Sequence, residues 1–416
     1  MKKVTLAILM ALMLFLVACG GEAPEATEEA VEEAVETEVE EVAEEEMAEE
    51  AVEEAAEEEM AEEAVEEVAE EEMAEEAVEE AAEEEMAEEA VEEAAEEEMA
   101  EEEMAEEEMA EEMMIDPITI SIVMPSATTD LAWSQAIYDA LVNVQGMYDE
   151  GVVTIEFTEG MFVVTDAAAA LRDYADGGAD IVIAHGTQFG TSLFELAPDF
   201  EDTAFVYGTS RDTGEEEGLT NISAYDAQAD EGGYVNGVIA ASLSESGIIG
   251  VVGPVEAGDA KLYIDGFIAG ATATNPDIEV LVAYTGSFGD TALAAEVAQT
   301  HIAAGADVLT GSAQQVVGSI GVAAEAGVPW LGTQSDQSPI AEDIVMATQM
   351  YDWTDMVLDV IEGQQAGDAG GDVYELTLEN GGLKMLLSDN LPDEVKEAAQ
   401  AAIDGIIAGE IAPLGE

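Results

Sequence analysis

Short apolar runs, rich in β-branched residues, alternate with stretches of helical spacing between residues 115 and 332. A brief apolar run between turn-forming residues is typical of a buried strand, and apolar positions three and four apart are typical of a helix packed on one face. The expected strands are 118–124, 152–157, 181–184, 204–207, 248–252, 279–283, 308–310 and 329–332. The expected helices are 133–144, 165–175, 192–196, 233–243, 262–273, 293–303 and 316–326.

This alternation predicts an α/β fold in which parallel sheets are flanked by helices. Nearly continuous apolar strands need cover on both faces, and the intervening helices supply it. A segment as long as 115–416 exceeds what one hydrophobic core usually holds, so we expect two units. Ligands of open α/β sheets bind beyond the carboxyl ends of the strands, and the loops after the strands are therefore the places to search for a site.

The first residues have the pattern of an exported lipoprotein. Lys2 and Lys3 precede an apolar run at 4–17, which is shorter than the about 20 residues a membrane-spanning helix needs and fits a secretory signal. The run ends in Leu-Val-Ala-Cys-Gly, and Cys19 is the only cysteine. This order resembles the lipobox of bacterial lipoproteins, which implies cleavage before Cys19 and a lipid anchor on it. An ordinary signal with an incidental cysteine is the alternative.

Residues 22–114 form a Glu-rich segment of a different kind. The segment holds 49 Glu and no Lys, Arg or aromatic residue, and a 13-residue repeat runs through it, as in AEEAVEEAAEEEM at 74–86. Like charges repel along every face of such a helix, and apolar residues recurring at this period give no steady heptad seam. We therefore expect a disordered or partly helical spacer that its own charge keeps extended.

The remainder of the chain is also acidic. The chain has 99 acidic residues, and subtracting the 49 of the spacer leaves 50 in residues 115–416; five basic residues oppose them, so the formal charge is about −45. Nucleic-acid binding needs basic surface to displace counterions. The composition therefore excludes that class of function.

Several loops after expected strands carry side chains suited to a small-molecule cleft, which needs a few aimed hydrogen bonds on an apolar lining. The candidates are Asp130, Trp133 and Ser134 after the first strand, His185 and Phe189 at 185–190, Ser312 at 311–314, and Gln334 and Asp336 at 333–338. Each has a more ordinary alternative. Asp130 is favoured as the cap of the following helix, like Asp290 before the helix at 293–303, and Trp133 could simply pack in a core.

Five motifs, in order along the chain, resemble those of one known family. They are Asp130-x-x-Trp133-Ser134-Gln135, Glu231-Gly-Gly-Tyr234-Val-Asn-Gly237, Tyr263-Ile-Asp-Gly266-Phe267-x-x-Gly270, Asn275-Pro-Asp-Ile278 followed by Tyr284-Thr-Gly-Ser-Phe-Gly-Asp290, and Gly332-x-x-Ser335-Asp336-Gln337-Ser338. Together they resemble the basic membrane protein (BMP) family of ABC-transporter substrate-binding lipoproteins, which includes purine nucleoside receptors. The resemblance implies a type I periplasmic-binding-protein fold, with a ligand between two lobes that three crossovers join.

The resemblance also implies roles for particular residues. In the family's nucleoside receptors, aromatic residues sandwich the base, which by motif would be Trp133 and Tyr263 here. Acidic residues and a lysine hold the ribose; Asp336 matches one of these acids and Tyr351 stands near the position of the lysine. Two further positions depart from the pattern, with Ser134 replacing Asn and Gln334 replacing Asp. We therefore expect a stacked ligand such as a purine nucleoside, nucleobase or related heterocycle, with weaker selectivity for ribose.

The motifs do not indicate an enzyme or a cofactor. His185 and His301 are the only histidines, and His301 falls inside an expected helix. The sequence has no Gly-x-Ser-x-Gly elbow, and neither a histidine pair for zinc nor a phosphate loop followed by lysine. Two alternative functions stay open: a sugar-binding receptor on the same fold, and a surface interaction or adhesion lipoprotein that uses its acidic stalk.

The sequence thus predicts a substrate-binding protein of an ABC importer. It would be held by lipid on the extracytoplasmic face of a bacterial cell membrane and deliver its ligand to permease and ATPase subunits on other chains. The expected parts are a signal at 1–18, a lipidated N-terminus at 19–21, a spacer at 22–114, a first lobe from 115–224 plus about 345–372, and a second lobe from 225–344 plus about 373–416.

Overall fold

A computed structural model describes residues 115–415; the signal, Cys19 and the Glu-rich segment lie outside the described residues. The strands are β1 (Ile118–Val123), β2 (Val153–Thr158), β3 (Ile181–Ala184), β4 (Ala204–Gly208), β5 (Ile222–Ala227), β6 (Ile248–Gly253), β7 (Glu279–Tyr284), β8 (Val308–Gly311), β9 (Trp330–Gln334), β10 (Val345–Tyr351), β11 (Val373–Leu376) and β12 (Leu383–Leu387). The helices are α2 (Trp133–Met147), α3 (Val164–Asp176), α4 (Gly190–Leu196), α5 (Ala229–Leu243), α6 (Gly258–Thr274), α7 (Thr291–Ala303), α8 (Val316–Ala326), α9 (Thr354–Ala366) and α10 (Asp393–Ile407). Short 3-10 turns occupy Thr187–Phe189, Ala197–Asp199 and Glu215–Glu217.

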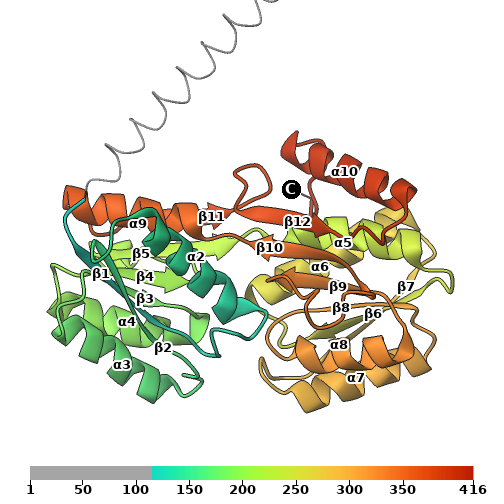
Figure 1. Ribbon diagram of the computed structural model, residues 1–416, viewed down its shortest axis with the longest axis horizontal. Coiled ribbons are helices and arrows are strands. Elements are labelled where there is room, and N and C mark those ends of the chain that lie inside the picture. The colour runs from blue at the N-terminus through green and yellow to red at the C-terminus, as the bar shows by residue number, and fades with distance from the viewer. Residues whose placement is uncertain (1–114, 416) are drawn as a thin grey trace, which may run out of the picture. The chain divides into compact units, whose positions relative to one another are not determined.

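The strands form two sheets of six strands each (Figure 1). The first sheet has the order β11-β5-β4-β3-β1-β2, and its neighbouring strands are all parallel. The second has the order β12-β10-β9-β8-β6-β7, in which only β12 runs antiparallel to its neighbour. We call the first sheet with α2, α3, α4 and α9 the first lobe, and the second sheet with the other helices the second lobe.

The predicted strands and helices are all present, because their apolar runs match the layers that cover them. The central strands β3, β8 and β9 are buried at every position, as parallel strands between two helical layers must be. Figure 1 shows α2 and α9 on one face of the first sheet and α3 and α4 on the other. In the second lobe, α5, α6 and α10 lie opposite α7 and α8. No helix within residues 115–415 combines the length and apolarity needed to cross a membrane.

The three boundaries of the expected lobes differ from the structure. The boundary at 224/225 falls inside β5 of the first sheet. Residues 345–372 are expected in the first lobe, but β10 pairs with β9 in the second sheet. Residues 373–416 are expected in the second lobe, but β11 pairs with β5 in the first sheet. The chain therefore crosses between the sheets after β5, after β10 and between β11 and β12. The periodicity of these strands is the same in either sheet, so only pairing could decide their membership.

The helices α5 and α6 pack so closely that their backbones approach each other. A Cβ built on Gly237 of α5 would lie 2.1 Å from the carbonyl oxygen of Phe267, and one built on Gly270 of α6 would lie 2.0 Å from that of Tyr234. Such distances are shorter than van der Waals contact, so a side chain at either position would push the helices apart. The glycine motifs at 231–237 and 263–270 therefore serve helix packing.

We expect Gly270→Ala to lower the free energy of unfolding by about 1 to 3 kcal/mol, because the added methyl overpacks a rigid backbone contact. The matched control is Gly321→Ala on α8, where an added Cβ meets nothing within 4 Å. The control should raise stability by about 0.5 to 1 kcal/mol through helix propensity. Urea unfolding of both variants tests the prediction, and equal effects would contradict it.

Candidate ligand-binding site

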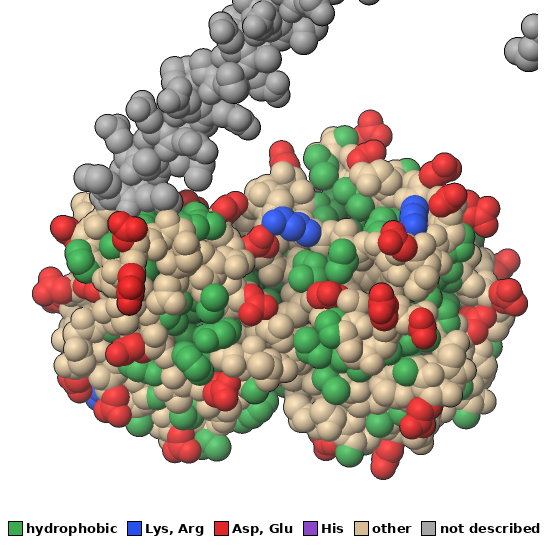
Figure 2. Space-filling model, viewed as in Figure 1, with side chains coloured by type: hydrophobic (Ala, Val, Ile, Leu, Met, Phe, Trp, Pro, Cys, Tyr) green, Lys and Arg blue, Asp and Glu red, His purple; other side chains and the backbone are tan. Residues whose placement is uncertain are grey.

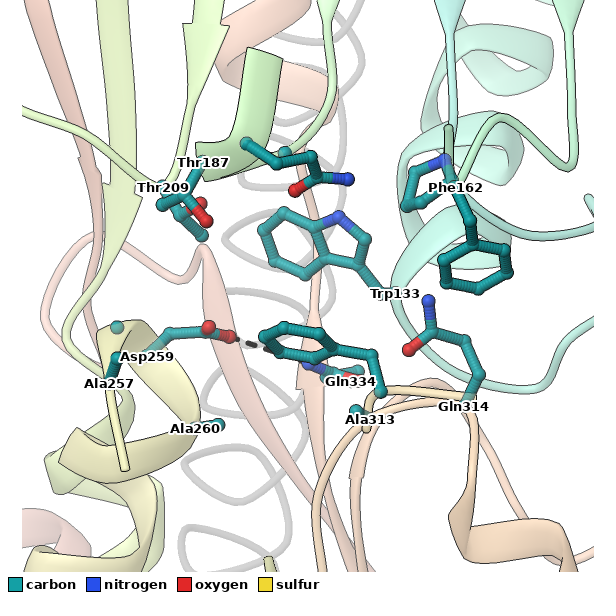
Figure 3. Close-up of a pocket in the computed structure, with 15 residues that line it drawn as sticks. Trp133, Phe162, Thr187, Thr209, Ala257, Asp259, Ala260, Ala313, Gln314 and Gln334 are labelled. Atoms are coloured by element: carbon teal, nitrogen blue, oxygen red, sulfur yellow. Dashed lines mark hydrogen bonds between the residues drawn. The ribbon is translucent and has the colours of Figure 1, made fainter. Parts of the chain in front are cut away.

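A cavity of about 190 Å³ lies between the two lobes (Figure 3). The lining comes from loops or strand ends that follow eight parallel strands, together with the starts of α2 and α6. Its residues are Pro125, Trp133, Phe162, Gly186, Thr187, Gln188, Thr209, Ala257, Gly258, Asp259, Ala260, Phe288, Ala313, Gln314 and Gln334. This is the edge at which open α/β sheets bind ligands, beyond the carboxyl ends of their strands.

Polar and apolar contacts bridge the lobes beside this cavity. The ring of Phe162, on the first lobe, reaches the second: its Cζ lies 3.2 Å from where a Cβ on Gly289 would stand. Hydrogen bonds across the lobes run from Ser335 Oγ to the Ala132 carbonyl (2.8 Å), from Gln314 Nε2 to Ser126 Oγ (2.9 Å) and from Gln337 Nε2 to the Leu131 carbonyl (3.3 Å). The lobes therefore enclose the cavity from both sides.

Trp133 borders the cavity with a rigid aromatic cluster behind it. Its ring stacks on His185, with centroids 4.1 Å apart and planes 10° from parallel. Tyr351 and Trp353 meet it edge-on at 6.2 and 6.0 Å, and Tyr225 stands 4.8 Å from Trp353. Tyr225 and Tyr351 lie at or near the ends of β5 and β10, where the chain crosses between sheets. The cluster thus fixes the tryptophan ring at the hinge.

His185 is fully buried behind the tryptophan and holds a defined tautomer. Its Nε2 lies 3.0 Å from the carbonyl oxygen of Trp133, and its Nδ1 lies 2.5 Å from the hydroxyl of Tyr225. Because a carbonyl only accepts, Nε2 carries the proton and Nδ1 accepts from Tyr225. Burial lowers the pKa of His185 from 6.5 to about 3, so the ring is neutral at physiological pH.

Asp259 supplies the cavity with a buried carboxylate. It lies in the first turn of α6, and its Oδ2 accepts hydrogen bonds from the hydroxyl of Tyr351 (3.2 Å) and from Nε2 of Gln334 (3.4 Å). Burial raises the pKa of this carboxyl, while the bonds from Tyr351, from Gln334 and from backbone amides of α6 oppose the rise. The carboxylate is thus held in place at the cavity wall by neutral donors.

A chain of hydrogen bonds fixes the amide of Gln314. The hydroxyl of Ser126 donates to the carboxylate of Asp130 at 2.6 Å. Ser126 can then only accept from its other two partners, Ser134 Oγ (2.6 Å) and Gln314 Nε2 (2.9 Å). The carbonyl end of Gln314 is left over. Within the described chain, this Oε1 and that of Gln334 are both buried without a hydrogen-bond partner.

The backbone of the lining is strained. Among the described residues, the non-glycine positions with positive φ are Leu131 (54°), Thr209 (54°), Ala313 (68°) and Gln334 (77°). Three of them line the cavity, and the carbonyl of Leu131 accepts a bond from the other lobe. Such conformations are unfavourable by about 1 to 3 kcal/mol each and cluster at functional sites. The strain therefore supports this cavity as the binding site.

Of the ten candidate binding residues, Trp133 and Gln334 line the cavity. Asp130 accepts bonds from the amides of Ala132, Ser134 and Gln135, so its carboxylate caps the first turn of α2 from two residues before the N-cap position, which is Ala132. Asp290 likewise accepts from the amide of Leu293. His301 is structural, with Nε2 bonded to the carbonyl of Val251 at 3.1 Å.

The other candidates lie outside the lining. Tyr263 was expected to form the aromatic sandwich with Trp133, but it is fully buried in the core and its hydroxyl bonds to Asn236 and Thr310. The carboxylate of Asp336 accepts hydrogen bonds from the backbone amide and the hydroxyl of Ser338. Four more are buried behind the cavity wall or in the core: Ser134, His185, Phe189 and Ser312. Tyr351 supports Asp259 from behind.

Several lining residues are not among the predicted ones, although they follow strand ends. Thr187, Gln188 and Gln314 lie in the same loops as the candidates His185, Phe189 and Ser312. Phe288 belongs to the motif that begins at Tyr284, which gave no sign of a binding role. Phe162 and Thr209 follow β2 and β4, and Asp259 lies in the first turn of the helix after β6; none of the three is among the predicted residues. A loop sequence gives no sign of which side chain points inward, since backbone conformation decides it.

Comparisons with known proteins agree with this architecture. The model of the Bmp family, described as ABC transporter substrate-binding protein PnrA-like, matches residues 118–412. A purine-binding protein of Brucella abortus (strain 2308) is 29% identical over 261 residues, which are 63% of this chain and 73% of that protein. The ABC transporter nucleoside-binding protein BmpA of Lactococcus lactis subsp. cremoris is 27% identical over 214 residues, 46% of this chain and 60% of that one.

A solved structure shares the fold. The solute-binding protein of an ABC transporter system from Aeropyrum pernix K1 superposes with a TM-score of 0.62 at 18% identity, covering 71% of this chain and 93% of that one. This likeness confirms the two-lobed periplasmic-binding-protein fold.

The buried His185 makes stability depend on pH. The unfolded chain takes up a proton near pH 6.5 and the folded chain only near pH 3, so the contribution of His185 is complete above pH 6.5 and is lost as the pH falls. From pH 6.5 to 4.5 the loss is about 2 to 3 kcal/mol, at about 1.4 kcal/mol per pH unit. Urea unfolding should therefore show that His185→Gln, which keeps a donor and an acceptor, loses less stability over this range than wild type. Parallel losses would contradict the prediction.

Proposed function

Because this chain belongs to the Bmp family of PnrA-like ABC transporter substrate-binding proteins, we propose that it is a receptor for a planar nitrogen heterocycle. The ligand is a purine nucleoside, a nucleobase or a related compound. It binds between the lobes and bridges them, and the closed form then delivers it to a permease and an ATPase on other chains.

The observation that carries this proposal is a flat, immobilised ring in a cavity between two lobes. Trp133 on the first lobe and Phe288 on the second both line that cavity, so a planar ligand can be held between rings from the two lobes. The side chains of Gln188, Gln314 and Gln334 also line it and can read the polar edge of a heterocycle. Stacking with polar edge contacts is the usual mode by which proteins hold a free base.

A binding role also fits the chemistry of the cavity better than catalysis. The carboxylate of Asp259 accepts hydrogen bonds from a tyrosine hydroxyl and an amide, and neither partner exchanges protons with it at neutral pH. His185 is enclosed behind Trp133 and bonded at both nitrogens, so it has no free nitrogen for proton transfer. We therefore propose that the protein releases its ligand unchanged.

We also propose that Cys19 anchors the protein by lipid to the extracytoplasmic face of the membrane. Two acyl chains give the stable attachment that a single chain does not. The Glu-rich segment at 22–114 then acts as a spacer, since a charged linker extends by self-repulsion.

A thermal-shift screen of the purified protein with nucleosides, free bases, flavins and sugars tests the ligand class. A ligand that binds only the folded state raises the melting temperature by mass action, and we expect the largest shift with a purine or related heterocycle. Phe288→Ala should weaken its binding by about fivefold to 100-fold, the range for loss of one stacking ring. The control is Phe157→Ala, a ring of similar exposure on β2 outside the lining. A shift with sugars alone would favour the sugar receptor instead.

Cys19→Ser tests the anchor. In a bacterial host, the wild-type protein should sediment with membranes and partition into the detergent phase of Triton X-114, because lipid holds it there. The variant should appear in the soluble extracytoplasmic fraction or keep its signal uncut. If the variant still partitions like wild type, Cys19 is not the anchor.

A further inference from the structure

The cavity carries negative charge with no positive side chain in its lining. Asp259 is the charged residue among those that line it, and the lining holds no Lys, Arg or His. Four of the five basic residues of the described chain are paired elsewhere: Arg172 with Asp199, Arg211 with Glu375, Lys261 with Asp265, and Lys384 with Asp352. The fifth, Lys396, bonds to the carbonyl of Asp389. A buried carboxylate without a cation is unfavourable, and no residue of the lining balances it.

The surroundings of Asp259 add to the negative potential. The pKa of Asp226, near the end of β5, is raised to about 6 by burial and then by the negative charge of the nearby Asp259, while Arg211 opposes the rise. Figure 2 shows acidic side chains spread over the visible face, with few basic ones among them. The amides at the start of α6 would otherwise attract an anion, but Asp259 itself occupies that helix end.

The unpaired polar atoms of the lining also favour a particular kind of ligand. The Oε1 atoms of Gln314 and Gln334 are acceptors left without a donor in the described chain, and the Oδ2 of Asp259 is an acceptor already satisfied by two neutral donors. Figure 3 shows Gln314, Gln334 and Asp259 around the same space as Trp133. A ligand that fits this set must offer hydrogen-bond donors to it.

Aromatic rings complete the environment. Trp133, Phe162 and Phe288 all line the cavity, and the face of an aromatic ring attracts a cation, with tryptophan the strongest. Several rings and one carboxylate around a single space form the arrangement that proteins use for organic cations.

We propose that the ligand is a heterocycle that carries a positive charge at neutral pH, with Asp259 as its counter-ion and specificity-determining residue. The charge stacks against Trp133, and N–H donors of the ligand satisfy the free carbonyls of Gln314 and Gln334. Phosphorylated and other anionic compounds are rejected, because the carboxylate repels them and no side chain of the lining compensates. The inference rests on the proposed function and narrows its ligand class.

Calorimetry on the purified full chain with two matched pairs of probes tests the charge. One pair is 1-methyladenosine, a cation at neutral pH, and neutral adenosine; the other is 1-methylnicotinamide, a permanent cation, and neutral nicotinamide. At least one cation should bind tenfold or more tightly than its neutral partner. Asp259→Asn keeps the shape of the side chain and one acceptor oxygen. It should abolish the preference for the cation by weakening the binding of the cation while leaving the binding of the neutral partner unchanged.

The control is Asp277→Asn, which removes the same charge from an exposed site before β7 and should leave the ratio unchanged. An unchanged ratio in this control shows that the preference for the cation comes from Asp259 and not from the general negative charge of the surface. Equal or tighter binding of the neutral partners in wild type overturns the inference but leaves the proposed receptor intact. Failure of both cations to bind also overturns it, whereas failure of the wider ligand screen would count against the receptor itself. The wild-type ratio decides the matter even if Asp259→Asn folds poorly.

Discussion

The stack of Trp133 on His185 is the contact on which both the hinge and the site depend. The tryptophan begins α2, the histidine follows β3, and the tyrosines that enclose them come from both sheets. Because His185 is neutral and bonded at both nitrogens, the ring behind the cavity cannot rotate without breaking buried hydrogen bonds. A flat wall is thus built at the point where the chain crosses between lobes, and a ligand that stacks on it also contacts the hinge.

The polar side of the cavity is likewise positioned by residues outside its lining. Asp130 caps α2, and in doing so it directs the hydroxyl of Ser126, which in turn directs the amide of Gln314 from the other lobe. Tyr351 packs against Trp133 and donates to Asp259. Residues that never line the cavity therefore decide which atoms face it. Helix capping and core packing thereby affect ligand selectivity: most buried polar groups are hydrogen-bonded within the protein, and the carbonyl oxygens of Gln314 and Gln334 are left for a ligand.

Much of this fold could be predicted from the amino-acid sequence. Apart from β5 (Ile222–Ala227), which the pattern did not predict, the strands and helices up to residue 334 follow from apolar periodicity, since covered parallel strands leave an unbroken apolar run. The rule that ligands bind beyond the carboxyl ends of parallel strands correctly predicted the edge of the sheets at which the cavity lies. Errors arose where a motif was read as a binding element. Tyr263 belongs to a motif whose glycines pack α6 on α5, and the tyrosine is buried in the core that this packing creates.

The sequence by itself determined the class of fold, the acidic character and the candidate loops, because these depend on local periodicity and composition. Tertiary structure alone decided which sheet β10 and β11 join, since either sheet accepts the same apolar pattern. It also decided that Asp259 and not Asp336 supplies the carboxylate of the cavity. Nothing in the sequence distinguishes these two aspartates as cavity residues. The direction in which a side chain points is set by backbone dihedral angles and by contact partners that are distant in the chain.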